Sequence, residues 1–157
     1  MSKPIKLGEI ADRKLVRATL EHFEKQISGY GVENAVVITD ANEVYRCVGD
    51  KNGVTSILDL GNKLRGASVT HNHPIGSSNE YSFSKFDIDM FMNYGLKFLR
   101  GIDEKFVYEL NRNASDLDMD NFSIEDLMNN PAGSMSRHIA VIKKAKELGI
   151  GYRRWSR

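Results

Sequence analysis

The chain has 157 residues, a formal net charge of +1, 27% charged residues and one cysteine, Cys47. This length predicts a single domain over 1–157 that buries about two-thirds of its unfolded surface. The charge balance gives no overall bias toward nucleic acid or anionic membrane. A lone cysteine excludes an internal disulfide and a multi-cysteine zinc site, and no apolar run reaches the roughly 20 residues of a membrane-spanning helix. With no signal-peptide pattern at its start, the chain is predicted to be soluble and cytoplasmic.

Apolar periodicity predicts the elements of the first half of the chain. An amphipathic helix is expected over about 8–26, where Val16, Leu20 and Phe23 recur at helical spacing. The β-branched run within 33–40 is typical of a strand buried on both faces, and 44–48 is predicted as its antiparallel partner. A short helix over 56–65, weakened by Gly61, then precedes a strand that ends at Pro74.

The second half is predicted to continue with a helix that begins at Ser84 and is closed by Gly95. Strands follow at 96–102 and 105–110, which gives an α/β fold with about five strands. An acidic segment from 112 is expected to form helix and loop, and a helix is predicted over 137–148. Within 137–157, seven basic residues and one acidic residue form a local basic patch.

The stretch 66–88 contains the residues that suit a metal site. His71 and His73 are separated by one residue, so on an extended backbone both imidazoles project to the same side. A hydrolytic zinc site needs about three protein ligands and a position for water. Asp87, in the first turn of the following helix, could supply the third ligand, and Asp89 competes with it. The pair alone is weak evidence, because H-x-H arises often by chance.

Two further residues could supply the remaining chemistry of hydrolysis. Glu33, at the start of the buried strand, is the best candidate for general base and acid, and Glu43 competes with it. Ser84 lies one helical turn before Asp87, so its hydroxyl could stabilise an oxyanion. A helix N-cap is the alternative interpretation of Ser84 and Asp87. The remaining candidates are interpreted as structural: His22 and His138 as structural or surface residues, and Cys47 as a small core residue.

Three segments in order, ENAVVITD at 33–40, LRGASVTHNHPIG at 64–76 and SFSKFDID at 82–89, resemble the JAB/MPN domain. The JAMM signature of that domain combines a strand glutamate, H-x-H-P and S-x-x-D. The resemblance covers 33–110. Within that superfamily, THNHP followed by SFS-x-x-DI is most similar to JAB-like domains of bacteriophage head-morphogenesis proteins and bacterial polymorphic toxins. The RadC family shares HNHP-x-G. The resemblance implies a mixed central sheet flanked by helices, with a core at about 9–111. Outside this core a helical, basic C-terminal extension is predicted at about 112–157, whose acidic segment and basic tail the resemblance does not explain.

Residue by residue, the resemblance implies His71, His73 and Asp87 as zinc ligands, Glu33 as proton shuttle and Ser84 as the group on the oxyanion side. One departure is the loop between His73 and Ser84, which at ten residues is three longer than in the family signature. A longer surface loop costs little entropy, so we expect it to reshape the substrate groove and to leave the site intact.

The leading hypothesis is therefore a zinc-dependent hydrolase of peptide or isopeptide bonds, phage-encoded and located in a bacterial host cell or a virion. A second hypothesis is a non-catalytic JAB-like module that binds a host or phage protein. A third is a RadC-like protein whose basic tail, with Trp155, binds nucleic acid, and a frayed, solvated C-terminus is the alternative for that tail. Zinc deaminases are disfavoured, because their P-C-x-x-C motif needs two cysteines.

Overall fold

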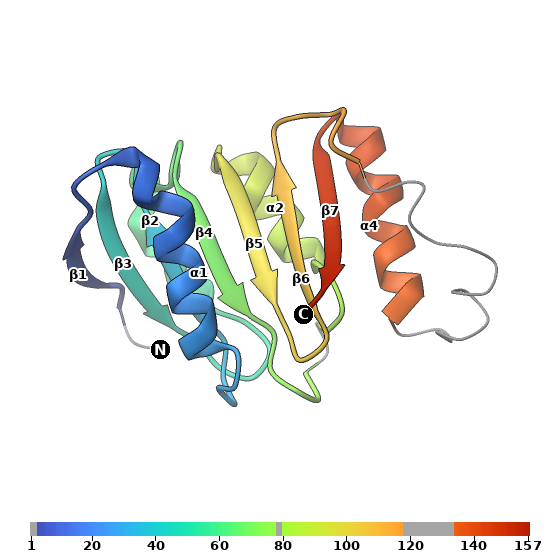
Figure 1. Cartoon of the computed structure of the whole chain (residues 1–157), viewed down its shortest axis with the longest axis horizontal. Coiled ribbons are helices and arrows are strands. Elements are labelled where there is room, and N and C mark those ends of the chain that lie inside the picture. Colours follow the sequence, from blue (N-terminus) through green and yellow to red (C-terminus); the bar gives the residue numbers. More distant parts are fainter. Residues whose placement is uncertain (1–2, 78–79, 118–133) are drawn as a thin grey trace.

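A computed structural model describes residues 3–77, 80–117 and 134–157 of the chain. These residues form one seven-stranded sheet with the strand order β1-β3-β2-β4-β5-β6-β7 (Figure 1). β4 and β5 run parallel, whereas the other neighbouring strands run antiparallel. The strands are β1 (Ile5–Glu9), β2 (Asn34–Ile38), β3 (Glu43–Val48), β4 (Ser68–Asn72), β5 (Phe98–Ile102), β6 (Phe106–Asn111) and β7 (Gly151–Ser156).

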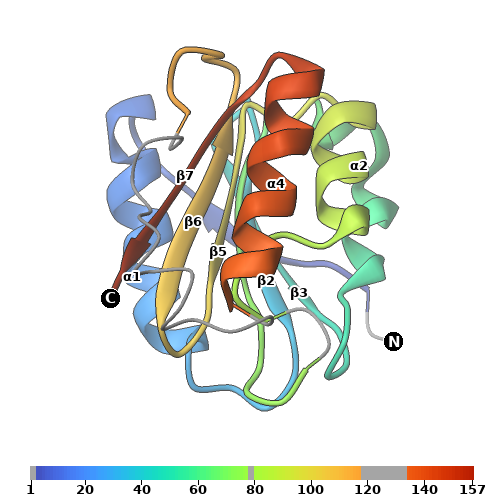
Figure 2. The same cartoon turned by 90° about the vertical axis from the view of Figure 1, so that its right-hand side faces the viewer.

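Helices cover both faces of the sheet. The helical elements are η1 (Arg13–Leu15), α1 (Val16–Ile27), η2 (Thr55–Leu64), α2 (Lys85–Asn93) and α4 (Ser134–Leu148). Figure 2 shows α1 on one side of the sheet and α2 and α4 on the other. The predicted α/β class and mixed sheet are confirmed, but the prediction of about five strands is wrong, because both edge strands were missed. No helix in the described ranges is long and apolar enough to cross a membrane.

The first missed strand, β1, lies where a helix was predicted. The predicted helix over 8–26 begins only at Val16, after a 3-10 turn. Asp12 caps that turn, since its Oδ1 accepts a hydrogen bond of 2.9 Å from the Lys14 amide. The preceding residues instead pair with β3 at the edge of the sheet.

The second missed strand, β7, corrects the prediction of a helical C-terminal extension. After α4 the chain returns to the sheet and pairs antiparallel with β6, with Tyr108 opposite Arg154. Tyr152 in this strand is fully buried, so the expectation of a frayed C-terminus is also wrong. Of the acidic segment predicted as helix and loop, residues 118–130 lie outside the described residues.

Two apolar cores hold the layers together, one on each face of the sheet. The smaller core packs α1 against β2 through residues such as Leu20, Val36 and Ile38. The larger core lies under η2, α2 and α4 and includes Val69 and Phe91. β4, α2 and β5 form a parallel β-α-β unit, and in such units ligands bind at the carboxyl ends of the strands. The predicted histidine strand ends at that position.

Candidate metal centre

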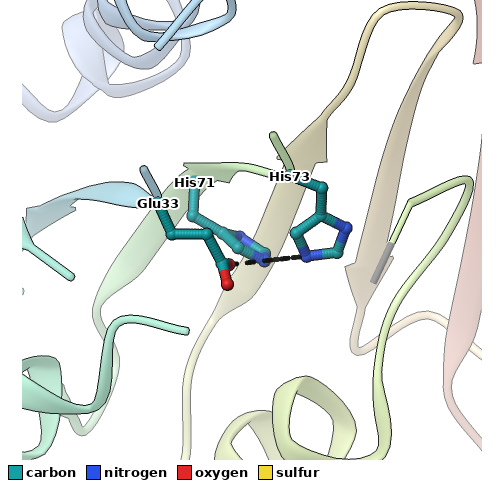
Figure 3. A group of neighbouring side chains, drawn as sticks. All are labelled: Glu33, His71 and His73. Carbon is teal, nitrogen blue, oxygen red and sulfur yellow. Dashed lines mark hydrogen bonds and ion pairs between the residues drawn. The ribbon is translucent and has the colours of Figure 1, made fainter. Parts of the chain in front are cut away.

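The two histidines of the H-x-H pair converge at the carboxyl end of β4. His71 is the fourth residue of the strand, and His73 follows its end, where its amide donates to the Ile102 carbonyl (2.9 Å). Both side chains are almost completely buried. Their Nε2 atoms lie 2.9 Å apart, so the prediction that they project to the same side is confirmed (Figure 3).

The outer nitrogens of the two rings fix which atoms face the centre. Nδ1 of His71 lies 2.7 Å from the Arg100 carbonyl, which can only accept, so Nδ1 donates and the neutral ring presents a lone pair at Nε2. Nδ1 of His73 lies 2.7 Å from the Tyr108 hydroxyl, so this ring nitrogen is also occupied by a hydrogen bond, and Nε2 faces the centre. Two ring nitrogens at 2.9 Å must share a proton or a cation, because two lone pairs at that distance repel.

Asp87 completes the contact between α2 and the histidines. Its Oδ1 lies 3.2 Å from Nε2 of His71, and its Oδ2 lies 3.3 Å from Nε2 of His73. The same Oδ2 accepts a hydrogen bond from the Ser84 amide (2.9 Å), and the N-terminus of α2 favours the negative charge. Helix capping therefore places this carboxylate at the centre.

Glu33 approaches from the sheet, one residue before β2. Its Oε1 lies 3.7 Å from Nε2 of His73, and Figure 3 shows its carboxylate beside both rings. Glu33, His71 and His73 are buried, and their ligand atoms all lie within 4.8 Å of one another, so this triad could hold a metal ion. Asp87 lies closer to both histidines than Glu33 does to His73, which favours Asp87 as the third ligand.

The spacing of the donor atoms fits a small divalent cation. Metal–nitrogen bonds of 2.0–2.1 Å in a tetrahedral site place ligand atoms about 3.4 Å apart. The observed separations between the two Nε2 atoms and the Asp87 oxygens are 2.9, 3.2 and 3.3 Å. Nitrogen and carboxylate donors, with both outer imidazole nitrogens hydrogen bonded, are a ligand set that such ions prefer.

Without a metal, the centre holds a proton. Burial acts to lower the pKa of His71, but the charge of Asp87, its hydrogen bond to the ring, the charge of Glu33 and the Arg100 carbonyl together raise that pKa to about 9. Burial lowers the pKa of His73. Burial acts to raise the pKa of Asp87, but the charges and hydrogen bonds of His71 and His73 together hold it well below its usual range. A protonated His71 can donate to His73, so a metal ion would replace this proton.

The competing carboxylates lie outside the centre. Glu43 forms ion pairs with Lys6 (3.2 Å) and Lys63 (3.0 Å) at the sheet surface. Asp89 is half exposed and lies 3.7 Å from Lys85. Neither is placed to act as a ligand or a base beside the histidines.

The other two histidines and the cysteine lie outside the centre. His22 lies on the exposed face of α1 beside Gln26. His138 is buried, and its Nδ1 lies 2.9 Å from the Tyr152 hydroxyl. Cys47 is buried in the larger core, as predicted.

Ser84 caps α2 and borders the centre at the same time. Its Oγ accepts a hydrogen bond of 3.2 Å from the Asp87 amide, and with the return bond from Asp87 this forms a capping box. The capping interpretation is therefore confirmed. Ser84 also lines a cavity of about 480 Å³ together with Glu33, His71 and Asp87.

Sequence reasoning missed the residues that support the histidines from behind. Tyr108 is fully buried beneath His73, and its ring occupies the space that a side chain at Gly101 would need. Arg100 is held by Glu24 (Nε to Oε1, 2.6 Å) and by Glu109 (Nη1 to Oε1, 3.1 Å), which fixes the strand whose carbonyl orients His71. No local pattern marks these residues, because cross-strand pairing brings them to the site.

The basic C-terminal residues brace the loop that follows His73. Arg154 Nη1 donates to the Tyr81 carbonyl (3.0 Å), and the Tyr81 amide donates to Asp103 Oδ2 (2.8 Å). Arg157 Nη1 donates to the Asp103 carbonyl (2.8 Å). Trp155 is 37% exposed and lies beside Arg153. Part of the basic patch is thus tied to the loop that follows His73.

Comparisons of the chain with protein-family models, with curated proteins and with solved structures gave no match.

Proposed function

We propose that the chain is a zinc-dependent hydrolase of peptide or isopeptide bonds, of the JAB/MPN type and encoded by a bacteriophage. The observation that carries the proposal is the convergence of His71, His73 and Asp87 on one point, with donor atoms 2.9 to 3.3 Å apart. A second carboxylate, Glu33, lies beside that point without being needed as a ligand. Three ligands, an additional carboxylate and an adjacent cavity are the components of a hydrolytic site.

His71, His73 and Asp87 would hold the zinc, which when bound supplies a Lewis acid that polarises a carbonyl and acidifies water. Zinc is favoured because two imidazoles and one carboxylate are typical ligands of catalytic zinc.

The remaining steps belong to side chains of the chain itself. Glu33 takes a proton from the attacking water and delivers it to the leaving amine, and its burial keeps that proton from solvent. The Ser84 hydroxyl, at the N-terminus of α2, donates to the oxygen that becomes negative as the carbonyl is attacked. Its Oγ already accepts a hydrogen bond from the Asp87 amide, so the hydroxyl hydrogen does not point at that amide.

The test is the metal content and the hydrolytic activity of the purified full chain. We expect about one zinc per chain, and cleavage in a mixed library of peptides and lysine-ε-linked isopeptides that stops on chelation. His71→Ala should lose both properties, and His22→Ala, which changes an exposed histidine on α1, should keep both.

A chain that binds no zinc, or that cleaves equally well after His71→Ala, contradicts the proposal. Stoichiometric zinc without any hydrolysis would instead favour the non-catalytic module that binds a host or phage protein.

A further inference from the structure

The cavity at the metal centre has a wall that the proposed chemistry does not use. Besides the groups of the centre and Asn52, Gly53, Thr55, Lys85 and Arg137, six apolar residues line it: Ala35, Val54, Ile57, Val69, Phe86 and Met90. All of them except Phe86 are buried members of the larger core. The cavity is therefore a recess that reaches from the metal centre to the apolar interior.

The lining of the cavity combines two kinds of chemistry. Glu33, His71, Ser84 and Asp87 belong to the centre, where the bond would be cleaved. Ile57 and Met90, contributed by η2 and α2, belong to the apolar lining. Water gains few hydrogen bonds against such a wall, so an apolar group would displace it with a gain in free energy.

The size and rim of the cavity also suit an apolar group. A volume of about 480 Å³ lies within the range of small-ligand pockets, and it exceeds the volume of any one side chain. Phe86, one residue before Asp87, is 38% exposed although it is a large apolar residue. It is therefore the solvent-exposed member of the apolar lining.

We propose that this cavity binds a large aliphatic or aromatic side chain next to the scissile bond, so that the substrates are peptides with such a residue at that position. The proposal rests on the proposed function, because the scissile bond is placed by the metal centre. It names a substrate class that the metal ligands alone do not determine.

The test compares two zinc-binding probes of different size on the zinc-loaded full chain. Acetohydroxamate carries a methyl group, and 4-methylpentanohydroxamate carries a branched chain long enough to enter the cavity. Calorimetric titration should give a dissociation constant at least ~10-fold lower for the branched probe, since an apolar pocket discriminates added methylene groups by about that factor or more.

Gly53→Phe supplies the variant that blocks the cavity. Gly53 lines it, and no atom lies within 4 Å of the position of an added Cβ, so a side chain can begin there without a clash. We expect the ratio of the two dissociation constants to fall toward one. Gly29→Phe is the matched control, because Gly29 also has open space around its added Cβ but lies outside the cavity, and it should keep the ratio.

The outcomes separate this inference from the proposed function. Equal affinities for the two probes, or an unchanged ratio in Gly53→Phe, overturn the apolar pocket and leave the hydrolase standing. A zinc-loaded chain that binds neither probe has no open position at the metal, which overturns both.

Discussion

Replacing Tyr108 by phenylalanine tests whether the residues behind His73 prepare it to bind metal. The Tyr108 hydroxyl is hydrogen bonded to His73 Nδ1 at 2.7 Å, and both side chains are buried. Phenylalanine keeps the ring that packs beneath the site and removes only the oxygen. The buried Nδ1 of His73 then loses its partner.

The magnitude follows from this one lost bond. A buried group left without its partner costs about 1–3 kcal/mol, so we expect unfolding of the metal-free variant to become easier by that amount. Loss of an outer hydrogen bond to a ligand histidine lowers metal affinity by about 10- to 100-fold. Zinc affinity is measured by competition with a chromophoric chelator, and stability by urea unfolding.

Tyr152→Phe is the matched control. Its buried hydroxyl lies 2.5 Å from the Ser82 hydroxyl and 2.9 Å from Nδ1 of His138, and neither of these partners is a proposed metal ligand. It should lose a similar amount of stability and keep the parent zinc affinity. Equal zinc affinities in the parent chain and in Tyr108→Phe would refute the role assigned to Tyr108.

Three further predictions concern the surroundings of the site. Gly101→Ala places a Cβ inside the Tyr108 ring, so we expect a loss of about 1–3 kcal/mol in urea unfolding. Burial, with the charge of Arg154, lowers the pKa of His138 from 6.5 to about 4, so its contribution to stability is complete above pH 6.5 and is lost as the pH falls to about 4. The slope of unfolding free energy against pH in that window should exceed that of His138→Gln, by at most about 1.4 kcal/mol per pH unit. Burial, with the charge of Asp59, raises the pKa of Cys47 to about 12, so a thiol reagent should modify this residue only when urea unfolds the chain.

The parts of the fold that the sequence predicts are those with strong local patterns. The β-branched run of β2, the turn before β3 and the Ser84 cap of α2 each depend on neighbouring residues. The H-x-H pair belongs to the same class, because strand alternation alone places both rings on one side.

The missed parts depend on pairing over long distances. β1 is exposed at most positions and β7 carries arginines at adjacent positions, so neither edge strand has the apolar alternation that marks a strand. Tyr108 reaches His73 only because β6 pairs with β5, where Gly101 lies opposite Tyr108. A sequence without such pairing information cannot place a tyrosine behind a histidine 35 residues away.

The most direct test of the hydrolytic centre is the rate of peptide hydrolysis by Glu33→Gln at full zinc occupancy. Glutamine keeps the shape of the side chain and cannot carry the proton, while His71, His73 and Asp87 are unchanged. We predict about one zinc per chain and a rate at least ~100-fold below that of the parent chain, since a general base contributes that much or more. An unchanged rate at full zinc occupancy would contradict the assignment of Glu33, and with it the mechanism.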